Sequence, residues 1–353
     1  EEKGKQAKNA GFSPGMLPAS TLRHTLRKAV TLQLRDIAKS LPPCHFKVEK
    51  IAPTAEQGAK AMALFRRLNE QIKKDRFTKD MGKLMGALTE APSFLDRCIQ
   101  GVGNQEDGSW SSEYPDGRGV WSFEGFDPAT RLPKEKWLLD YLDNQFSQGR
   151  DAIVLSWHLN LLPRLREIIE KDLKVIAPIL YSDKVAPKNR ETWIQKELDG
   201  RGAKVFLVNP VSISTGLNAL IRFSSIVWFE NCLNAYTFRQ ANGRIIRIGQ
   251  RQPQELTSLC YDSEDSRGAV QVLLHRLLMH KVGVSEGIEG LDPAAALQAA
   301  GVGDQDSLAG KDIGRLISSM LDGDESSLRL LQREFIDRLS TKTDEATALG
   351  GVV

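Results

Sequence analysis

The amino-acid sequence predicts an α/β protein in which helices cover both faces of an open parallel sheet. Between residues 132 and 282, short apolar or β-branched runs alternate with segments of helical or turn character, which is the order of a parallel sheet. The chain has 353 residues, of which 41% are hydrophobic and 26% are charged. This length and composition indicate a globular protein with a sizeable core and about two domains, or one domain with large additions.

Five apolar runs between residues 152 and 261 are the expected strands: AIVLSW, KVIAPILY, AKVFLVN, SSIVWFE and ELTSLCY. A sixth, CHFKVEKIAP, begins at Cys44 and alternates apolar with polar side chains, as a strand does. The segment TAEQGAKAMALFRRLNEQI follows it, with helical periodicity and with Thr54 as a candidate N-cap. The segment LPKEKWLLDYLDNQF is a further expected helix, placed directly before AIVLSW.

These elements divide the chain into three parts. Residues 1–40 are expected to be a linker and a helix from the end of a preceding lobe, because Pro42 and Pro43 stop that helix. Residues 41–282 form the main lobe, with a helical insertion at about 103–131 whose glycine- and serine-rich part is expected to be a loop or hairpin. Residues 283–353 form a C-terminal helical extension with a frayed tail.

Composition limits the classes of partner and compartment. The 48 basic and 45 acidic side chains give a net charge of +3, so any site for a polyanion must be local. Four widely spaced cysteines without a C-x-x-C pair argue against a zinc site and a disulfide framework, and favour reduced thiols in an intracellular protein. No apolar run approaches the ~20 residues of a membrane helix. The polar first residues resemble a linker, so we expect a longer parent protein.

Function in an open parallel sheet gathers at the carboxyl ends of the strands, and one such loop is VSISTGLNAL. It follows the strand KVFLV and offers hydroxyls and backbone N–H groups that suit a phosphate. The alternative interpretation is a serine or threonine helix cap followed by a glycine turn. The residues that we expect to bind phosphate groups here are Ser212, Ser214, Thr215, Gly216 and Asn218.

The loop after AIVLS contains Trp157, His158 and Asn160. His158 is a candidate for contact with a phosphate backbone. The alternative interpretation is a partly buried histidine whose hydrogen bonds are satisfied within the protein.

The stretch RQANGRIIRIGQR, residues 239–251, predicts a cationic helix face beside an apolar one if helical spacing is applied throughout. The cationic face holds Gln240, Arg244, Arg247 and Arg251, and the apolar face holds Ala241, Ile245 and Ile248. Gly243 lets a ligand approach the backbone closely. The alternative interpretation is an ordinary solvated run of arginines.

Together, these segments resemble the C-terminal RecA-like lobe of superfamily-two helicases, and specifically of the SWI/SNF-related DNA translocases. The segment SSIVWFENCLNAYTFRQANGRIIRIGQR is similar to the family's strand, acid and turn, followed by Gln-Ala, Gly-Arg and Arg-Ile-Gly-Gln. STGLNAL matches the preceding family motif, and AIVLSWHLNLLPRLREII is similar to motif IV. The resemblance extends over residues 41–282. Leu233 and Ala235 depart from the tryptophan and proline of the family's turn.

This resemblance implies that Arg244 and Arg247 reach the γ-phosphate of ATP bound with Mg²⁺ on a preceding RecA-like lobe. It also implies that Gln240, Gly243 and Gly216 couple nucleotide contacts to lobe closure. The implied DNA-binding residues are Ser212, Ser214, Thr215, His158 and Asn218, which grip double-stranded DNA largely independently of its sequence. The insertion or the C-terminal helices are available for a protein partner.

The sequence contains no GxxxxGK[ST] phosphate loop, no DEAH-like acid cluster and no metal site, so we expect this chain alone to be inactive. Three hypotheses stay open. The chain is the second lobe of an ATP-driven DNA translocase, a non-catalytic DNA- or protein-binding module that kept the fold, or part of a strand-separating helicase.

Overall fold

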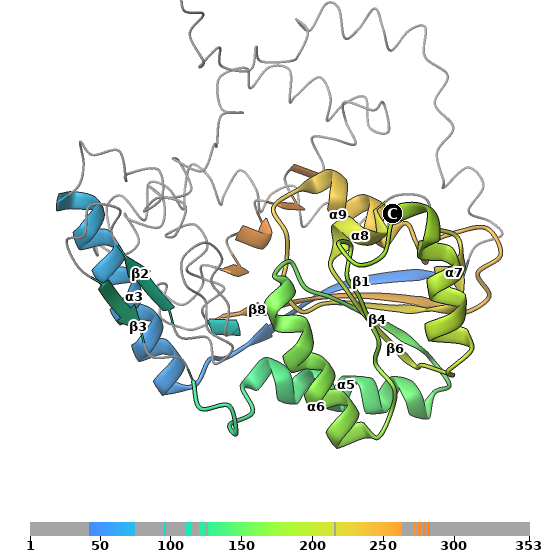
Figure 1. Ribbon diagram of the computed structural model, residues 1–353, viewed down its shortest axis with the longest axis horizontal. Helices are drawn as coiled ribbons and strands as arrows, with labels where there is room; N and C mark the ends of the chain where they lie inside the picture. Colours follow the sequence, from blue (N-terminus) through green and yellow to red (C-terminus); the bar gives the residue numbers. More distant parts are fainter. Residues whose placement is uncertain are drawn as a thin grey trace, which may run out of the picture.

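A computed structural model describes residues 42–74, 95–96, 110–113, 120–123, 126–214, 217–262 and most positions from 271 to 282. Its centre is a six-stranded sheet in the order β1-β8-β7-β4-β6-β5, in which every neighbouring pair is parallel (Figure 1). The strands are β1 Cys44–Ile51, β4 Ala152–Leu155, β5 Ile179–Leu180, β6 Val205–Val208, β7 Ser225–Trp228 and β8 Gln254–Tyr261. The six expected strands and the α/β fold class are thereby confirmed.

The central strands are apolar throughout because both of their faces are covered. All residues of β4, β6 and β7 are buried, and their side chains alternate between two core clusters. On one face, Val154 and Val227 pack with α5 Pro133–Ser147 and α6 Leu162–Leu173. On the other face, Ile153 and Trp228 pack with residues of α7 Arg190–Ile194, α8 Pro210–Ile213 and α9 Ala235–Asn242 (Figure 1). The prediction of helices on both faces is therefore confirmed.

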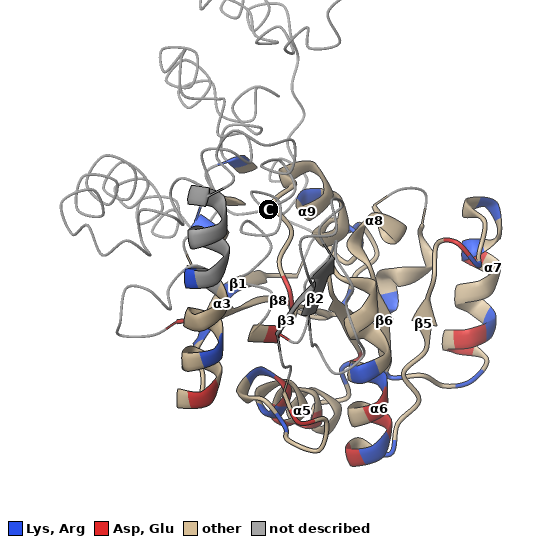
Figure 2. Cartoon of the chain, turned by 60° about the vertical axis from the view of Figure 1, so that its left-hand side comes forward, with Lys and Arg blue, Asp and Glu red and all other residues tan. Residues whose placement is uncertain are grey.

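Three helices of the described lobe are short: α7 Arg190–Ile194, which continues as a π-turn over Gln195–Asp199, α8 Pro210–Ile213 and α9 Ala235–Asn242. Helix α3 Ala55–Lys74 is longer, with 20 residues. Three 3₁₀ turns cover Leu159–Leu161, Pro187–Asn189 and Ala219–Arg222. Figure 2 shows that α6 and α7 carry residues of both charges, whereas the one charged residue of α9, Arg239, is basic.

Polar side chains at the starts of α3 and α5 define where these helices begin. The amide of Gln57 donates to Thr54 Oγ1 at 3.1 Å, and the amide of Thr54 donates to Gln57 Oε1 at 2.9 Å. This reciprocal capping box confirms Thr54 as the N-cap of α3. At α5, the Glu135 carboxylate accepts the amide of Leu132 at 2.9 Å and binds Arg164 of α6 at 3.0 Å. The same carboxylate therefore starts α5 and attaches it to α6.

The described part of the insertion is an antiparallel hairpin of β2 Trp110–Glu113 and β3 Val120–Phe123. The loop or hairpin expected there is confirmed, and the insertion at 103–131 is a β-ribbon rather than helical as far as it is described. The helices expected within 1–40 and 283–353 lie outside the described residues. In the described ranges, Cys44, Cys232 and Cys260 are free thiols, and no helix has the length and apolarity to cross a membrane.

His275, in the last described helical segment, makes the stability of the fold depend on pH. Its ring stacks on Phe46 at 5.9 Å, and neither ring nitrogen has a hydrogen-bond partner among the described residues. Burial lowers the pKa of His275 from 6.5 to about 4. Between these two values the unfolded chain binds a proton that the folded chain does not, so stability increases as pH rises from about 4 to about 6.5.

We therefore expect His275→Phe to be more stable than the parent by about 2 kcal/mol at pH 5, with a much smaller difference at pH 8. Phenylalanine keeps the aromatic stack on Phe46 and cannot take up a proton. Urea unfolding of both proteins at several pH values measures the difference. A difference that does not change between pH 5 and pH 8 contradicts the prediction.

Candidate functional site

Three loops that follow parallel strands lie at one edge of the sheet, because the carboxyl ends of parallel strands point the same way. They are residues 156–158 after β4, residues 209–218 after β6 and residues 229–234 after β7. The last of these leads into α9. Residues 231–251, which include α9 and the turns that follow it, contain four arginines and no acidic residue, so positive charge is concentrated there.

The helical reading of residues 239–251 is wrong beyond Asn242. The amide of Gly243 makes the last helical hydrogen bond, to Arg239 O at 2.9 Å, and the next two amides form tighter turns, with Arg244 N bonded to Ala241 O at 3.1 Å. Gly243 and the β-branched residues after it have low helix propensity. The predicted apolar face is also lost, because the Ile248 side chain is 70% exposed while Ile245 is buried.

Arg244 and Arg247 nevertheless come together, because both side chains bind the loop after β6. They do not share a helix face. Arg244 donates from Nη1 to the carbonyl of Leu217 at 3.2 Å and from Nη2 to the carbonyl of Ser214. Arg247 donates from Nη1 to the same Leu217 carbonyl at 3.2 Å and to Asn218 Oδ1. We refer to these two residues as the arginine pair. The loop carbonyls partly compensate the repulsion between two neighbouring cations.

The two members of the arginine pair differ in their access to a ligand. The Arg244 side chain is 5% exposed, and its Nε has no partner among the described residues. Burial lowers the pKa of Arg244, and so does the neighbouring charge of Arg247, while Tyr236 opposes this effect. Arg247 is half-buried, and its Nε donates to Gly243 O at 3.2 Å. Arg247 is therefore the member that can reach an added anion most directly.

The loop after β6 does not present its hydroxyl groups as the sequence suggested. Ser212 is buried, and the Ser214 hydroxyl donates to the carbonyl of Val211 at 2.9 Å. The N-cap of α8 is Asn209, whose Oδ1 accepts the amide of Val211 at 2.9 Å. Thr215 and Gly216 lie outside the described residues. Of the expected phosphate ligands that are described, only Asn218 is exposed.

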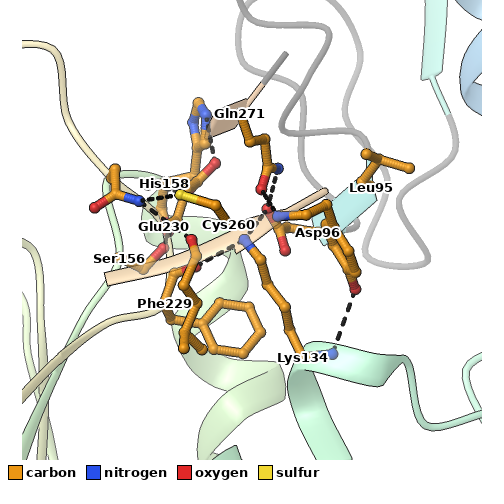
Figure 3. Close-up of polar contacts among 12 residues, drawn as sticks. Leu95, Asp96, Lys134, Ser156, His158, Phe229, Glu230, Cys260 and Gln271 are labelled. Atoms are coloured by element: carbon orange, nitrogen blue, oxygen red, sulfur yellow. Dashed lines mark hydrogen bonds and ion pairs between the residues drawn. The ribbon is translucent and has the colours of Figure 1, made fainter. Parts of the chain in front are cut away.

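His158 is placed inside the protein and not on its surface. Its side chain is 2% exposed, and its Nε2 lies 3.2 Å from Glu230 Oε1. The other oxygen of Glu230 accepts the amide of His158 at 3.0 Å and the Ser156 hydroxyl at 3.1 Å (Figure 3). This arrangement agrees with the alternative interpretation in the burial of the ring and in its contact with Glu230, although Nδ1 has no hydrogen-bond partner among the described residues. The predicted DNA contact is corrected: His158 joins the loop after β4 to the end of β7.

Gly243 lies beside the arginine pair, since its carbonyl accepts from Arg247, and two nearby residues without a predicted role, Gly249 and Gln250, shape the same turns. Gln240 is half-buried in the last turn of α9, and Gly243 has an ordinary helical φ of −61°. Gly249, in contrast, has a φ of +101°, and an added Cβ there would lie 3.2 Å from Ile221 Cδ1. Gln250 Nε2 donates to the carbonyls of Ile221 and Phe223 at 3.0 and 2.9 Å. Gly249 and Gln250 thus anchor the turns that carry Arg247.

Figure 3 also shows a buried ion pair that no sequence pattern predicts, since its residues are distant in the chain. Lys134 Nζ lies 3.1 Å from Asp96 Oδ2, donates to the carbonyl of Phe229 at 3.1 Å, and lies 4.8 Å from the centre of the Tyr261 ring. Burial raises the pKa of Asp96 to about 6, although Lys134 opposes this effect. Gln271 also donates to Asp96, at 2.8 Å. The cluster holds the end of β7 just before Glu230.

We expect Lys134→Met to lower the free energy of unfolding by about 3–5 kcal/mol. Both members of the pair are buried, so the charge of the Asp96 carboxylate is no longer compensated by a cation in this variant. The double variant Lys134→Met with Asp96→Asn should recover at least half of this loss, because the amide is neutral and still accepts from Gln271. Urea unfolding of the two single variants and the double variant measures the coupling. A double variant whose loss equals the sum of the two single losses refutes it.

Comparisons with known proteins give a fold and no close relative. No family model matches the sequence, and no curated protein matches it. Among solved structures, the C-terminal part of the Fun30 ATPase domain matches with a TM-score of 0.50 and 16% identity, over 67% of this chain and 90% of that one. The SWI2/SNF2 ATPase core of Sulfolobus solfataricus in complex with dsDNA gives a TM-score of 0.47 and 17% identity, over 77% of this chain and 49% of that one. The Fun30 match shows that the lobe has the fold of the C-terminal part of that ATPase domain.

Proposed function

We propose that this chain is the second motor lobe of an ATP-dependent translocase of double-stranded DNA, acting on ATP bound to a preceding lobe. The observation that carries the proposal is the arginine pair at the carboxyl edge of the sheet, where both guanidinium groups meet at the carbonyl of Leu217. The motif resemblance of residues 225–251 and the fold of the Fun30 lobe support it. The proposed location of such a motor is intracellular, because its DNA substrate is inside the cell.

The chemistry assigned to the pair is stabilisation of negative charge during transfer of the γ-phosphoryl group. A guanidinium fork fits phosphate oxygens and stays charged, so it needs no proton transfer. Arg247 is the finger, because it is half-buried and gives up only neutral acceptors, on Gly243, Leu217 and Asn218, when it turns to the triphosphate. Arg244 is a positioning residue, because it is buried and holds Ser214 and Leu217. Its charge also raises the local potential.

Magnesium, when bound, supplies further charge neutralisation at the phosphates. In the described ranges, no three His, Cys, Asp or Glu side chains form a group that could hold a metal ion. The residues of this lobe therefore do not fit the metal, and we place Mg²⁺ on the preceding lobe and route no step through it here.

The same contacts explain how ATP turnover changes the grip on DNA. When Arg247 leaves the loop for the phosphate, Leu217 O and Asn218 Oδ1 each lose one donor, so the loop is free to shift. Gly243, whose carbonyl accepts from Arg247 Nε, and Gln240 in the last turn of α9 are the proposed coupling residues. Exposed Asn218 and the preceding residues Thr215 and Gly216 are the proposed contacts to the DNA backbone. Ser212, Ser214 and His158 are buried and are left out of this surface.

One observation favours a second candidate, a non-catalytic binding module that keeps the fold. Arg244 and Arg247 both donate to loop atoms of their own chain, and such bonds stabilise a loop without any nucleotide. The two candidates differ in whether Arg247 matters for turnover. A strand-separating helicase differs from both in an unwinding assay.

In the two-lobe protein, Arg247→Ala should reduce ATP turnover by about 10³-fold or more, the usual effect of losing an arginine finger, and should leave the fold intact. Arg244→Ala should reduce turnover and also lower stability by about 1–3 kcal/mol, because the buried carbonyls of Ser214 and Leu217 lose donors. Phosphate release and urea unfolding measure the two effects.

Arg251→Ala is the matched control, because Arg251 lies in the same cationic stretch and is exposed. It should behave as the parent protein in both assays. The contrary outcome is an Arg247→Ala variant of normal stability whose ATP turnover is within a few-fold of the parent. That result would mean that the arginine pair has only a structural role, and it would favour the binding module.

We also expect this chain alone to show no significant ATP turnover, with or without duplex DNA. It lacks a glycine-rich phosphate loop with its lysine, so nothing in its sequence holds a triphosphate opposite the arginine pair. Its DNA affinity should be weak and should fall steeply with salt concentration. The assay is repeated after the preceding lobe is added or fused. DNA-stimulated turnover by this chain alone refutes the half-motor proposal.

A further inference from the structure

Tyr236 is an aromatic residue whose side chain lies outside the hydrophobic core. It lies in the first turn of α9 and is 58% exposed, although the neighbouring Phe238 is buried against Trp228 at 4.7 Å and against Phe46 at 6.1 Å. The start of α9 is held in place, because Asn234 Oδ1 accepts the amide of Thr237 at 2.9 Å. The ring of Tyr236 is therefore presented to solvent from a rigid support.

The ring lies on the side of α9 that leads to the arginine pair. Tyr236 and Gln240 are four residues apart, so they occupy one face of α9, which ends at Asn242 just before Gly243 and Arg244. Tyr236 is near enough to Arg244 to raise the pKa of its guanidinium group, against the larger effect of burial. An exposed aromatic ring, an amide and two guanidinium groups thus follow one another along residues 236–247, with no acidic residue between them in the chain.

We propose that Tyr236 stacks on the base of the nucleoside triphosphate whose γ-phosphate is met by the arginine pair. This inference rests on the proposed function and adds to it a base-binding residue on the second lobe. Different groups bind the two ends of the ligand: guanidinium groups bind the phosphates, and an aromatic ring binds the face of the base.

A free nucleotide fits this surface better than duplex DNA does. In a duplex, both faces of each base are covered by the neighbouring base pairs, so an exposed ring finds no base to stack on unless the duplex is distorted. A free nucleotide offers an open base face and a triphosphate on the same molecule. Because every base has such a face, stacking tolerates any base and is strongest for the larger purine.

The test is steady-state turnover of the two-lobe protein with ATP, GTP and CTP, in the parent, Tyr236→Ala and Tyr236→Phe. We expect Tyr236→Ala to raise the KM for ATP about 10-fold, which corresponds to about 1.4 kcal/mol, while kcat stays within about twofold. Tyr236→Phe keeps the ring and should retain the parent KM. The preference for ATP over CTP should shrink in Tyr236→Ala, and inhibition by tripolyphosphate, which has no base, should not change.

Val211→Ala is the matched control. Val211 lies on neighbouring α8, is also exposed, and has no ring, so its loss should leave the KM unchanged. An unchanged KM in Tyr236→Ala overturns the proposal, and a loss of duplex DNA affinity in its place would show that the ring contacts DNA. An equal loss of tripolyphosphate inhibition also overturns it, because that result indicates a disturbed phosphate site.

The two proposals fail separately. If Arg247→Ala abolishes turnover and Tyr236→Ala leaves the KM unchanged, only the base-stacking role is lost. If Arg247→Ala leaves turnover intact, the proposed function fails whatever the KM of the Tyr236 variants.

Discussion

The carbonyl oxygen of Leu217 is the acceptor on which the arrangement of this site depends. It accepts from Arg244 and from Arg247, so two cations that repel each other are held against one loop. The turns after α9 take their shape from these bonds and from Gln250, which binds the carbonyls of Ile221 and Phe223. A loop that holds both arginines is also a loop that changes when one of them leaves, and this links phosphate chemistry to the rest of the lobe.

Buried carboxylates fix the position of the strand end that leads to α9. Glu230 binds the backbone of His158, and Asp96 binds Lys134, whose ammonium group also reaches the carbonyl of Phe229. Charges in such positions must be paired, because an isolated buried charge is costly. The cluster therefore gives β7 one defined end, and α9 starts from it five residues later with Asn234 as its cap. Rigid support of this kind is what a group that must meet a phosphate requires.

Periodicity predicted the sheet well and the arginine segment poorly, for one physical reason. The strands β4, β6 and β7 are buried on both faces, so their composition is apolar throughout and unmistakable. In residues 239–251, arginines and isoleucines recur at helical spacing, but Gly243 ends the helix and the guanidinium groups find acceptors on a loop that is distant in sequence. His158 was misplaced likewise, because its partner Glu230 lies 72 residues away.

By itself, the sequence determined the order of the strands along the chain, the capping of α3 by Thr54, the hairpin in the insertion and the residue types of the arginine pair. These features depend on local propensity and on patterns of a few residues. Only the tertiary structure decided the strand order across the sheet, the loop that receives Arg244 and Arg247, and the burial of His158 and Ser212. It also decided that Tyr236 is exposed while Phe238 is buried, because exposure depends on which other segments pack against α9, and those segments are brought together only by the fold.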